Sequence, residues 1–458
     1  MTSNRKAILT ALLFAIVIAV GVFINWDNIR SKLEQERVDP AALAALENTP
    51  LAAIQPFASS AGWPQWRGPN RDGVAPAGPF RTDWKTNPPK PVWSVPCGGG
   101  YGQPIVVAGK LYLHDYAEGK ERLRCLDANT GEVKWEHADV VDYSGFKLGY
   151  GSGPRATPTI HEGRIYTVGA TGLFNCFVLP IANELLQRIW KHELLAEFDA
   201  KMPTWGVASS PLIVNDTVVV QPGGKKGSVV GLHAKTGEVR WTVGNGPSGY
   251  SSPILATDNN VPLIVAMTGD SIYGFNGIGE LMWAQSWVTQ HFGNIATPIA
   301  VGGYLFVSSS YGKGCGLFQI SNPEKGAVPA KEVYFRKNRV MSNHHSTCVY
   351  RDGFLYGFDG SELACVDLKK GERVADWHAT DDDGREFSKG SLTLVGDKLL
   401  GLTETGTLFL GTASHEGFTF LGQVKNIFSG RESWAAPVVV DGRIYVRDGE
   451  KIVCFEVK

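Results

Sequence analysis

The sequence predicts an all-β fold, an eight-bladed β-propeller that follows one N-terminal transmembrane helix and a short helical stalk. The 458 residues include 54 glycines, 25 prolines and 13 tryptophans, and only 19% of them are charged. This composition is typical of strands joined by tight turns. One strand pattern also recurs along the chain, with a second pattern after most of its copies. Repeats of this length indicate propeller blades.

The N-terminal segment predicts a membrane anchor. From residue 7 to residue 24 every side chain is apolar or small except Thr10, and a helix of this length matches the hydrocarbon thickness of a bilayer. Arg5 and Lys6 precede the run and Asp27 follows it. The positive-inside rule then keeps residues 1–6 in the cytoplasm and places the rest outside, in the periplasm of a bacterium with two membranes.

A cleaved secretory signal is the alternative interpretation of this segment. Residues 17–19 make a poor cleavage site, because Val17 and Ile18 are not small, and the apolar run continues past them. We therefore expect a single-pass signal anchor, followed by a helical stalk and linker over residues 25–60 and by the propeller over residues 61–458.

The recurring pattern is an apolar residue and proline, about four residues, a glycine, two residues and a tyrosine or its equivalent. Its copies lie about 42 to 54 residues apart, which fits one four-stranded blade each. The equivalent positions are Pro104, Pro158, Pro211, Pro253, Pro298, Cys348, Leu392 and Pro437.

A second pattern closes most repeats, at residues 125–135, 233–241, 275–283 and 366–377. Each copy predicts a strand, a tight turn with glycine at a positive φ, and a strand that ends in tryptophan. These tryptophans are expected to fill the space between blades. The last repeat ends after three strands, so residues 91–95, which carry the same tryptophan, are predicted to close the ring as its fourth strand.

The seven cysteines predict neither a disulfide framework nor a metal site. No two of them form a C-x-x-C pair or another metal-ligand spacing. Cys125, Cys176, Cys365 and Cys454 occupy one repeat position on different blades, where a small buried side chain suits a strand. Equivalent positions on separate blades are too far apart to bridge.

Three segments carry a family resemblance: residues 63–74 (WPQWRGPNRDGV), the repeated D-x-x-T-G-E-V-x-W, and residues 153–172. Over about residues 61–458 the chain resembles the pyrroloquinoline-quinone-like (PQQ-like) repeat proteins. That superfamily includes the quinoprotein alcohol dehydrogenases and BamB-like outer-membrane assembly factors. The resemblance implies a β-propeller and leaves the chemistry to be argued from a site.

The candidate site lies at one mouth of the central channel. In a propeller the loops from each outer strand to the next inner strand open onto one face. The residues three before each repeat position, with close neighbours, would form a ring of aromatic and cationic side chains there. The predicted site residues are Tyr101, Arg155, Trp205, Tyr250, Asn294, His344, His345, Lys389, Arg431 and Trp434, with Ala208 and Ile295 in the same ring and Lys225, Lys226 and Lys313 on nearby turns.

Such a ring suits a planar or anionic ligand, or an acidic protein segment. For any single member the commoner situation is a solvated polar group or an aromatic that caps a blade edge. Residues 67–74 present a similar choice between a docking or lid element and a strap. In the strap, Trp63 and Trp66 pack over the propeller and Arg67 pairs locally with Asp72.

The first functional hypothesis is a membrane-anchored, extracytoplasmic propeller that binds a protein partner or a ligand without catalysis. It predicts no catalytic residue, cofactor or metal. The alternative is a PQQ-dependent quinoprotein dehydrogenase that uses the funnel with calcium. Enzymes of that kind commonly carry adjacent cysteines, which this sequence lacks. A hydrolase or lyase with His344 or His345 as base has no nucleophile motif to support it. The formal net charge of −1 argues against nucleic acid as a partner.

Overall fold

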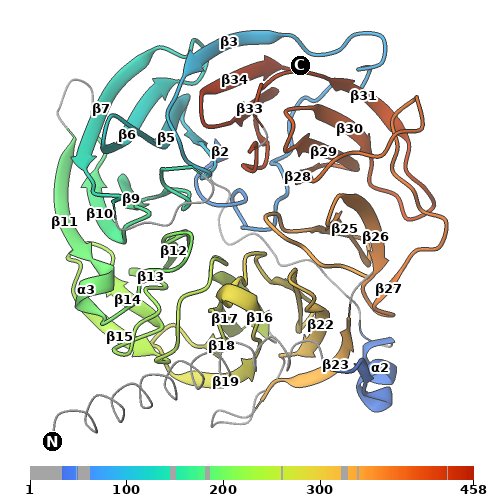
Figure 1. Cartoon of the computed structure of the whole chain (residues 1–458), viewed down its shortest axis with the longest axis horizontal. Helices are drawn as coiled ribbons and strands as arrows, with labels where there is room; N and C mark the ends of the chain where they lie inside the picture. The colour runs from blue at the N-terminus through green and yellow to red at the C-terminus, as the bar shows by residue number, and fades with distance from the viewer. Residues whose placement is uncertain are drawn as a thin grey trace, which may run out of the picture.

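The computed structural model describes residues 34–47, 49, 62–144, 151–180, 186–258, 261–320, 329–337, 340–430 and 432–458. Within these ranges the chain forms eight antiparallel sheets arranged in a ring, with the first strand of each sheet toward the centre (Figure 1). The all-β, eight-bladed architecture predicted from the repeats is confirmed. The residues of the expected transmembrane helix, 7–24, lie outside the described residues. No helix in the described part of the chain is long and apolar enough to cross a membrane.

Each blade runs outward from its first strand to its fourth. The first four blades are β4 (Ile105–Val107), β5 (Lys110–Ala117), β6 (Lys120–Asp127) and β7 (Val133–Val140); β8 (Thr159–His161), β9 (Arg164–Val168), β10 (Leu173–Val178) and β11 (Gln187–Glu193); β12 (Leu212–Val214), β13 (Thr217–Val220), β14 (Val229–His233) and β15 (Val239–Val243); and β16 (Ile254–Asp258), β17 (Val261–Met267), β18 (Ser271–Phe275) and β19 (Leu281–Ser286).

The remaining blades follow the same order, and two short helices interrupt the loops. The strands are β20 (Ile299–Val301), β21 (Tyr304–Ser309), β22 (Gly314–Gln319) and β23 (Lys331–Arg336); β24 (Val349–Arg351), β25 (Phe354–Asp359), β26 (Glu362–Asp367) and β27 (Glu372–Arg373); β28 (Gly390–Val395), β29 (Lys398–Thr403), β30 (Leu408–Thr412) and β31 (Phe420–Val424); and β32 (Val438–Val440), β33 (Arg443–Arg447), β34 (Lys451–Glu456) and β3 (Pro91–Pro96). The helices are α3 (Leu194–Glu197) and η1 (Gln290–Phe292).

The eighth blade joins the two ends of the propeller. Its outer strand is β3, which pairs antiparallel with β34 and places Trp93 opposite Cys454. Cys454 in turn lies opposite Tyr445 of β33. Pairing β3 with β34 removes the edge that three strands alone would leave exposed.

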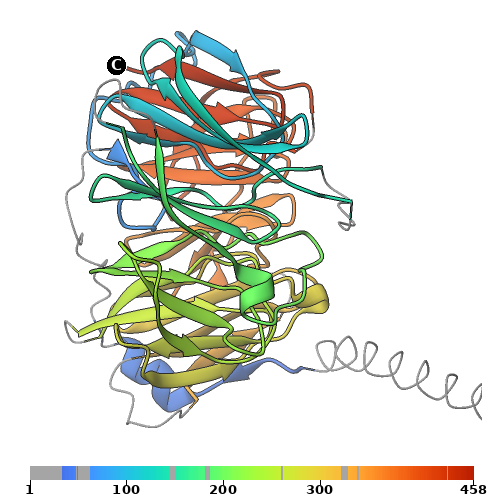
Figure 2. The same ribbon diagram turned by 90° about the vertical axis from the view of Figure 1, so that its left-hand side faces the viewer.

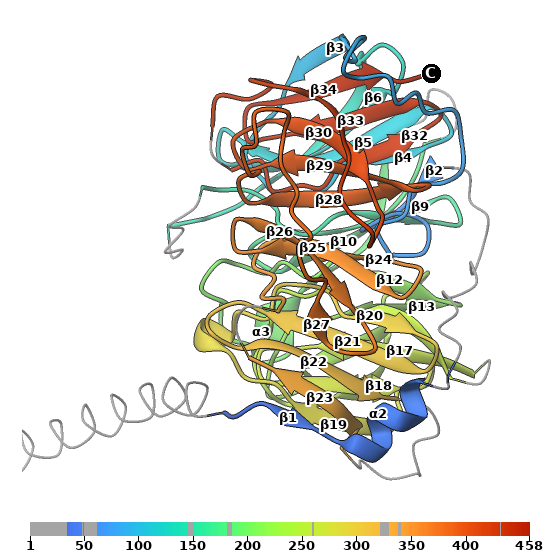
Figure 3. The same ribbon diagram turned by 90° about the vertical axis from the view of Figure 1, so that its right-hand side faces the viewer.

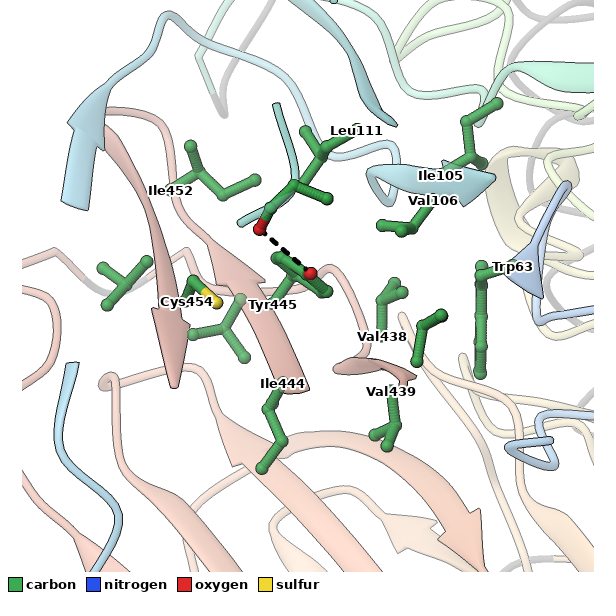
Figure 4. Packing of buried hydrophobic residues seen from close by; sticks show 14 of the residues in the cluster. Trp63, Ile105, Val106, Leu111, Val438, Val439, Ile444, Tyr445, Ile452 and Cys454 are labelled. Atoms are coloured by element: carbon green, nitrogen blue, oxygen red, sulfur yellow. Dashed lines mark hydrogen bonds between the residues drawn. The ribbon is translucent and has the colours of Figure 1, made fainter. Parts of the chain in front are cut away.

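The seams between blades are built from aromatic side chains, several of which are hydrogen-bonded to the next blade. Trp93 Nε1 and Tyr445 Oη both donate to the carbonyl of Ala128 on the first blade, at 3.2 and 3.1 Å. Figure 4 shows the apolar side chains of this seam, with Tyr445 among valines and isoleucines of both blades. Gly131, in the turn between β6 and β7, adopts φ +76°, and an added Cβ there would lie 2.8 Å from the ring of Trp93. The closing tryptophan therefore requires the turn glycine.

The same seam recurs between the second and third blades. Trp190 Nε1 and Tyr166 Oη donate to the carbonyl of Ala234, at 3.2 and 3.1 Å. Gly237, at φ +78°, lies under the ring of Trp190. Since one geometry appears at distant points of the chain, the repeat pattern encodes the contact between blades as well as the strands.

Residues 62–75 fill the centre of the ring, and we call them the channel plug. Their strand β2 (Gly62–Trp63) pairs with the inner strand β4, and Trp63 is fully buried. The guanidinium groups of Arg67 and Arg71 are buried and donate to backbone carbonyls on opposite sides of the ring. Their partners are Thr347 and Cys348 for Arg67, and Ser210 and Pro211 for Arg71.

The channel plug corrects the interpretation of this segment as a strap over the propeller. It lies inside the channel, where each buried arginine donates to carbonyls just before an inner strand. Arg67 also donates to the carbonyl of Asp72 rather than pairing with its carboxylate. Ala75 N–H donates to the carbonyl of Leu394, which ties the plug to the seventh blade.

The described part of the expected stalk, residues 34–47, packs on the propeller and does not stand apart from it. We call it the N-terminal clasp. Its strand β1 (Arg37–Val38) adds to the outer edge of β23. Its helix α2 (Pro40–Glu47) buries Ala42 and Leu46 against the fifth and sixth blades. Figure 3 shows both elements in blue on the outside of the ring, beside β23. The pattern of small and apolar residues that predicted a helix also supplies its buried face.

Candidate functional site

The loops that run from each outer strand to the next inner strand surround a cavity of about 370 Å³. We call the side where it opens the cavity face, which also carries the turns between second and third strands. The opposite side is the distal face. Figure 2 shows the ring from its side, with α3 and η1 on the loops of the cavity face. The lining residues are Trp66, Tyr101, Arg155, Trp205, Ala208, Ser210, Tyr250, Ser252, His291, Ile295, Tyr311, His344, His345 and Trp434.

Most of the residues predicted from the sequence meet at this cavity. Seven of the ten line it, together with the ring members Ala208 and Ile295. Lys389 stands behind the lining and contacts it through His344. Arg431 lies outside the described residues. The seven lining residues are Tyr101, Arg155, Trp205, Tyr250, His344, His345 and Trp434.

Asn294 and the three turn lysines do not take part. The Asn294 side chain is fully buried, and its amide donates to the carbonyls of Thr268, Gly269 and Trp287. It fastens a loop of the fourth blade. Lys225 and Lys226 are exposed on the cavity face, and Lys313 is buried in the fifth blade. None of these side chains is among the lining residues.

Seven rings form a continuous arc around the cavity, which we call the aromatic arc. Successive ring centroids are 4.0 to 6.2 Å apart; four of the six separations lie within the range of favourable aromatic pairs, and the two that involve His345 are shorter. In order, the members are Tyr101, Trp434, His345, His344, Tyr311, Trp205 and Tyr250. The Tyr101–Trp434 and Trp205–Tyr311 pairs are stacked, with interplanar angles of 25° and 13°. The arc therefore presents π faces and ring edges to a ligand.

The two histidines at the middle of the arc are uncharged at neutral pH. Burial, together with the charge of Lys389, lowers the pKa of His344 to about 4. Burial and the two neighbouring groups lower the pKa of His345 to about 2. Lys389 Nζ donates to His344 Nδ1 at 2.9 Å, so the proton of His344 resides on Nε2, which lies 3.0 Å from Tyr311 Oη. His345 Nδ1 is buried and has no hydrogen-bond partner within the described part of the chain.

Arg155 is the one lysine or arginine among the described lining residues, and three of its five N–H groups are engaged. Nε donates to the carbonyl of Trp205 at 2.7 Å, Nη2 donates to that of Gly151 at 2.9 Å, and Nη1 bonds to Gly153. The guanidinium carbon also lies 5.2 Å from the ring centroid of Tyr101. Burial lowers the pKa of Arg155. Arg155 therefore fixes the loops and the ring of Tyr101, with little donor capacity left for an anion.

Sequence reasoning missed five lining residues: Trp66, Ser210, Ser252, His291 and Tyr311. Ser210 and Ser252 each precede a repeat proline, so the Ser-Ser-Pro copies could have indicated them. Tyr311 lies on the turn that was predicted to contribute Lys313. The ring of Tyr311 lines the cavity, whereas Lys313 is buried in the blade. No local pattern marks His291 or Trp66, because η1 and the channel plug bring them to the cavity.

The cavity residues do not fit the quinone and calcium that the alternative function requires. The quinone is a planar tricarboxylate, which needs several free cationic donors. Most donors of Arg155 are bound to backbone carbonyls, and Lys389 is bound to His344. Calcium needs six to eight oxygen ligands. Within the described residues no three histidine, cysteine, aspartate or glutamate side chains converge as a metal site would require.

Comparison with known proteins shows which folds this chain resembles. The family model described as outer membrane protein assembly factor BamB matches residues 186–410, from the second blade to the seventh. No curated protein sequence matches the chain.

Three solved structures are similar across most of the chain. BamB from Moraxella catarrhalis has a TM-score of 0.55 at 14% identity, covering 81% of this chain and 98% of its own. Quinohemoprotein alcohol dehydrogenase ADHIIG from Pseudomonas putida HK5 has a TM-score of 0.59 at 14% identity, covering 92% and 82%. The computationally designed Ika8 protein has a TM-score of 0.51 at 12% identity, covering 79% and 96%. At these identities the likeness establishes the fold alone.

Proposed function

Since the chain is a PQQ-like repeat β-propeller, we propose that it is a non-catalytic binding protein, anchored in a membrane by residues 7–24. In this proposal the propeller lies on the extracytoplasmic side, the periplasm of a bacterium with two membranes. The occupant of its cavity is a planar, uncharged group, such as an aromatic side chain of a partner protein or a ring-bearing small molecule.

The aromatic arc is the observation that carries this proposal. Its rings line a cavity of about 370 Å³, within the size range of small-molecule sites. Flat apolar groups gain from stacking on such rings and from leaving water. A multiply charged anion would lose its hydration and find most donors of Arg155 already occupied. Of the planar or anionic ligands expected from the sequence, the geometry therefore favours neutral planar groups.

The same geometry argues against acid–base catalysis. A general base works best with a pKa near the working pH, whereas the pKa of His344 is lowered to about 4 and that of His345 to about 2. The Nδ1 atom of His344 is also occupied by Lys389.

A titration of the full-length protein in detergent with the neutral dye prodan (6-propionyl-2-dimethylaminonaphthalene), read against a protein-free detergent blank, tests the binding proposal. This probe is planar and uncharged, and its emission rises and shifts to shorter wavelength in an apolar site. We expect saturable binding that the Trp205→Ala variant weakens at least about tenfold, the equivalent of roughly 1.4 kcal/mol. Phe292→Ala is the matched control, because Phe292 is 42% exposed on the same rim and does not line the cavity. Equal binding by both variants would contradict the proposal.

The enzymatic alternative is tested on the same preparation. Calcium and pyrroloquinoline quinone are added, the absorbance spectrum is recorded, and dye reduction is measured with simple alcohols and sugars. We expect neither a bound-cofactor band nor turnover. Stoichiometric binding with turnover would assign the protein to the quinoprotein dehydrogenases.

A further inference from the structure

The N-terminal clasp has a defined direction relative to the cavity. β1 is antiparallel to β23, with Arg37 opposite Phe335 and Val38 opposite Tyr334. β23 ends at Arg336 and leads into the loop that carries His344 and His345, two of the residues that line the cavity. β23 therefore runs toward the cavity face, and β1 runs away from it. The chain reaches the propeller at the cavity face.

Contacts at the two ends of the clasp agree with this direction. At its start, Lys313 Nζ donates to Glu34 Oε2 at 2.5 Å, from the same turn that places Tyr311 in the cavity. At its end, Lys369 Nζ donates to the carbonyl of Glu47 at 2.8 Å, from the β26–β27 turn of the distal face. Figure 3 shows β1 and α2 following the side of the fifth blade from one face to the other.

The clasp is firmly built. The Lys313 side chain is only 4% exposed, and Nζ lies 4.7 Å from the ring centroid of Trp287 and 5.4 Å from that of Phe335. A buried ammonium in this setting needs its carboxylate partner, Glu34. Leu46, at the other end, is fully buried. The point at which the chain joins the propeller, at Glu34, is therefore fixed relative to the cavity.

The length of the intervening chain limits how the propeller can sit at a membrane. Residues 25–33 separate the apolar run from Glu34, and nine residues span at most roughly 30 Å when fully extended. A six-residue strand spans about 20 Å before its turns are added. If the distal face met the bilayer, this linker would have to cross the thickness of the ring with almost no slack. The cavity face can approach the bilayer without such extension.

We propose that the cavity face lies against the surface of the membrane that holds residues 7–24, so that the cavity opens toward the lipid headgroups. This inference rests on the membrane anchor of the proposed function and adds to it the orientation of the propeller. A ligand of the cavity then approaches from the bilayer side, and a large soluble partner reaches the distal face more readily.

Two variants of the full-length protein, each with one added cysteine, test the orientation. Lys225 and Lys235 belong to turns on opposite faces of the third blade, and each is exposed and forms one exposed ion pair, with Asp199 and Glu162 respectively. Lys225→Cys and Lys235→Cys are labelled with a fluorophore and reconstituted in vesicles whose lipids carry a headgroup quencher. The unmodified protein is the labelling blank, since its cysteines are buried except for the half-buried Cys97. We expect several-fold stronger quenching of the label at 225.

Each outcome has a distinct meaning. Equal quenching, or stronger quenching at 235, overturns the orientation while leaving the anchor intact. If the protein does not float with the vesicles, the anchor fails and the orientation fails with it. Val38→Pro with Leu46→Asp, added to each labelled variant, should release the clasp and reduce the difference between the two labels. An unchanged difference in these variants would also overturn the proposal, because the clasp would not be what orients the propeller.

Discussion

The seams between blades and the aromatic arc use the same residue types for different ends. At a seam, Trp190 packs over the turn glycine Gly237 and donates its Nε1 proton to the next blade. In the arc, Trp434 stacks between Tyr101 and His345 with one side facing the cavity. A seam aromatic is therefore a structural element that repeats with the blade. An arc aromatic lies on a loop between blades where the residue type changes from blade to blade, and it keeps surface available for a ligand.

The largest expected effect separates these two roles directly. Trp190→Ala should lower the free energy of unfolding by about 3 to 5 kcal/mol, because it opens a cavity and removes one of the two donors to the Ala234 carbonyl, leaving only Tyr166. Trp434→Ala should cost about 1 kcal/mol and abolish probe binding, since its ring is only half-buried. Denaturant unfolding and the dye titration measure both variants. Comparable destabilisation with retained binding in both would erase the distinction.

A smaller effect tests the seam through its glycine. Gly131 and Gly109 have φ of +76° and +72° on the same blade, but only Gly131 lies under a tryptophan. Gly109→Ala should cost about 1 kcal/mol for backbone strain alone. Gly131→Ala should cost roughly 2 to 3 kcal/mol, because its Cβ would also displace the ring of Trp93. Thermal and denaturant unfolding of the pair give the difference, and equal costs would mean that the tryptophan contact is dispensable.

The smallest effect concerns pH and the arc. The pKa of His345 is lowered to about 2 in the folded protein, against an unfolded value of about 6.5. Above pH 6.5 neither state is protonated at this ring, and below it the unfolded state takes up a proton that the folded state does not. Stability therefore falls as the pH drops from 6.5 toward 5, by about 1 kcal/mol for this half-buried group.

His345→Phe keeps a ring in the arc and removes this titration. Denaturant unfolding at pH 7, 6 and 5 should show a weaker pH dependence for the variant than for the unmodified protein. The comparison between the two proteins isolates His345 from His114, whose pKa is also lowered to about 4 by burial. Identical pH profiles would mean that His345 does not titrate differently on unfolding.

The site could be predicted in part because it follows from the repeat. Tyr101, Arg155 and Tyr250 each lie three residues before a repeat position, and that register places them at the channel mouth. Register does not encode what a side chain contacts. The Asn294 amide donates to three backbone carbonyls, and Arg155 donates to carbonyls of the loops. These partners are known only once the loops have folded.

The sequence by itself determined the eight blades, the turn glycines and the tryptophans of the seams, because these features are local and recur with the period of the blade. Only the tertiary structure decided how segments outside the repeat are used. Residues 62–75 enter the channel because the carbonyls that satisfy Arg67 and Arg71 come from blades far apart in the chain. Residues 34–47 bind the fifth and sixth blades because Lys313 and the apolar side chains around Leu46 come together only when those blades fold and pack. Such pairings have no period, so they depend on which surfaces folding brings together.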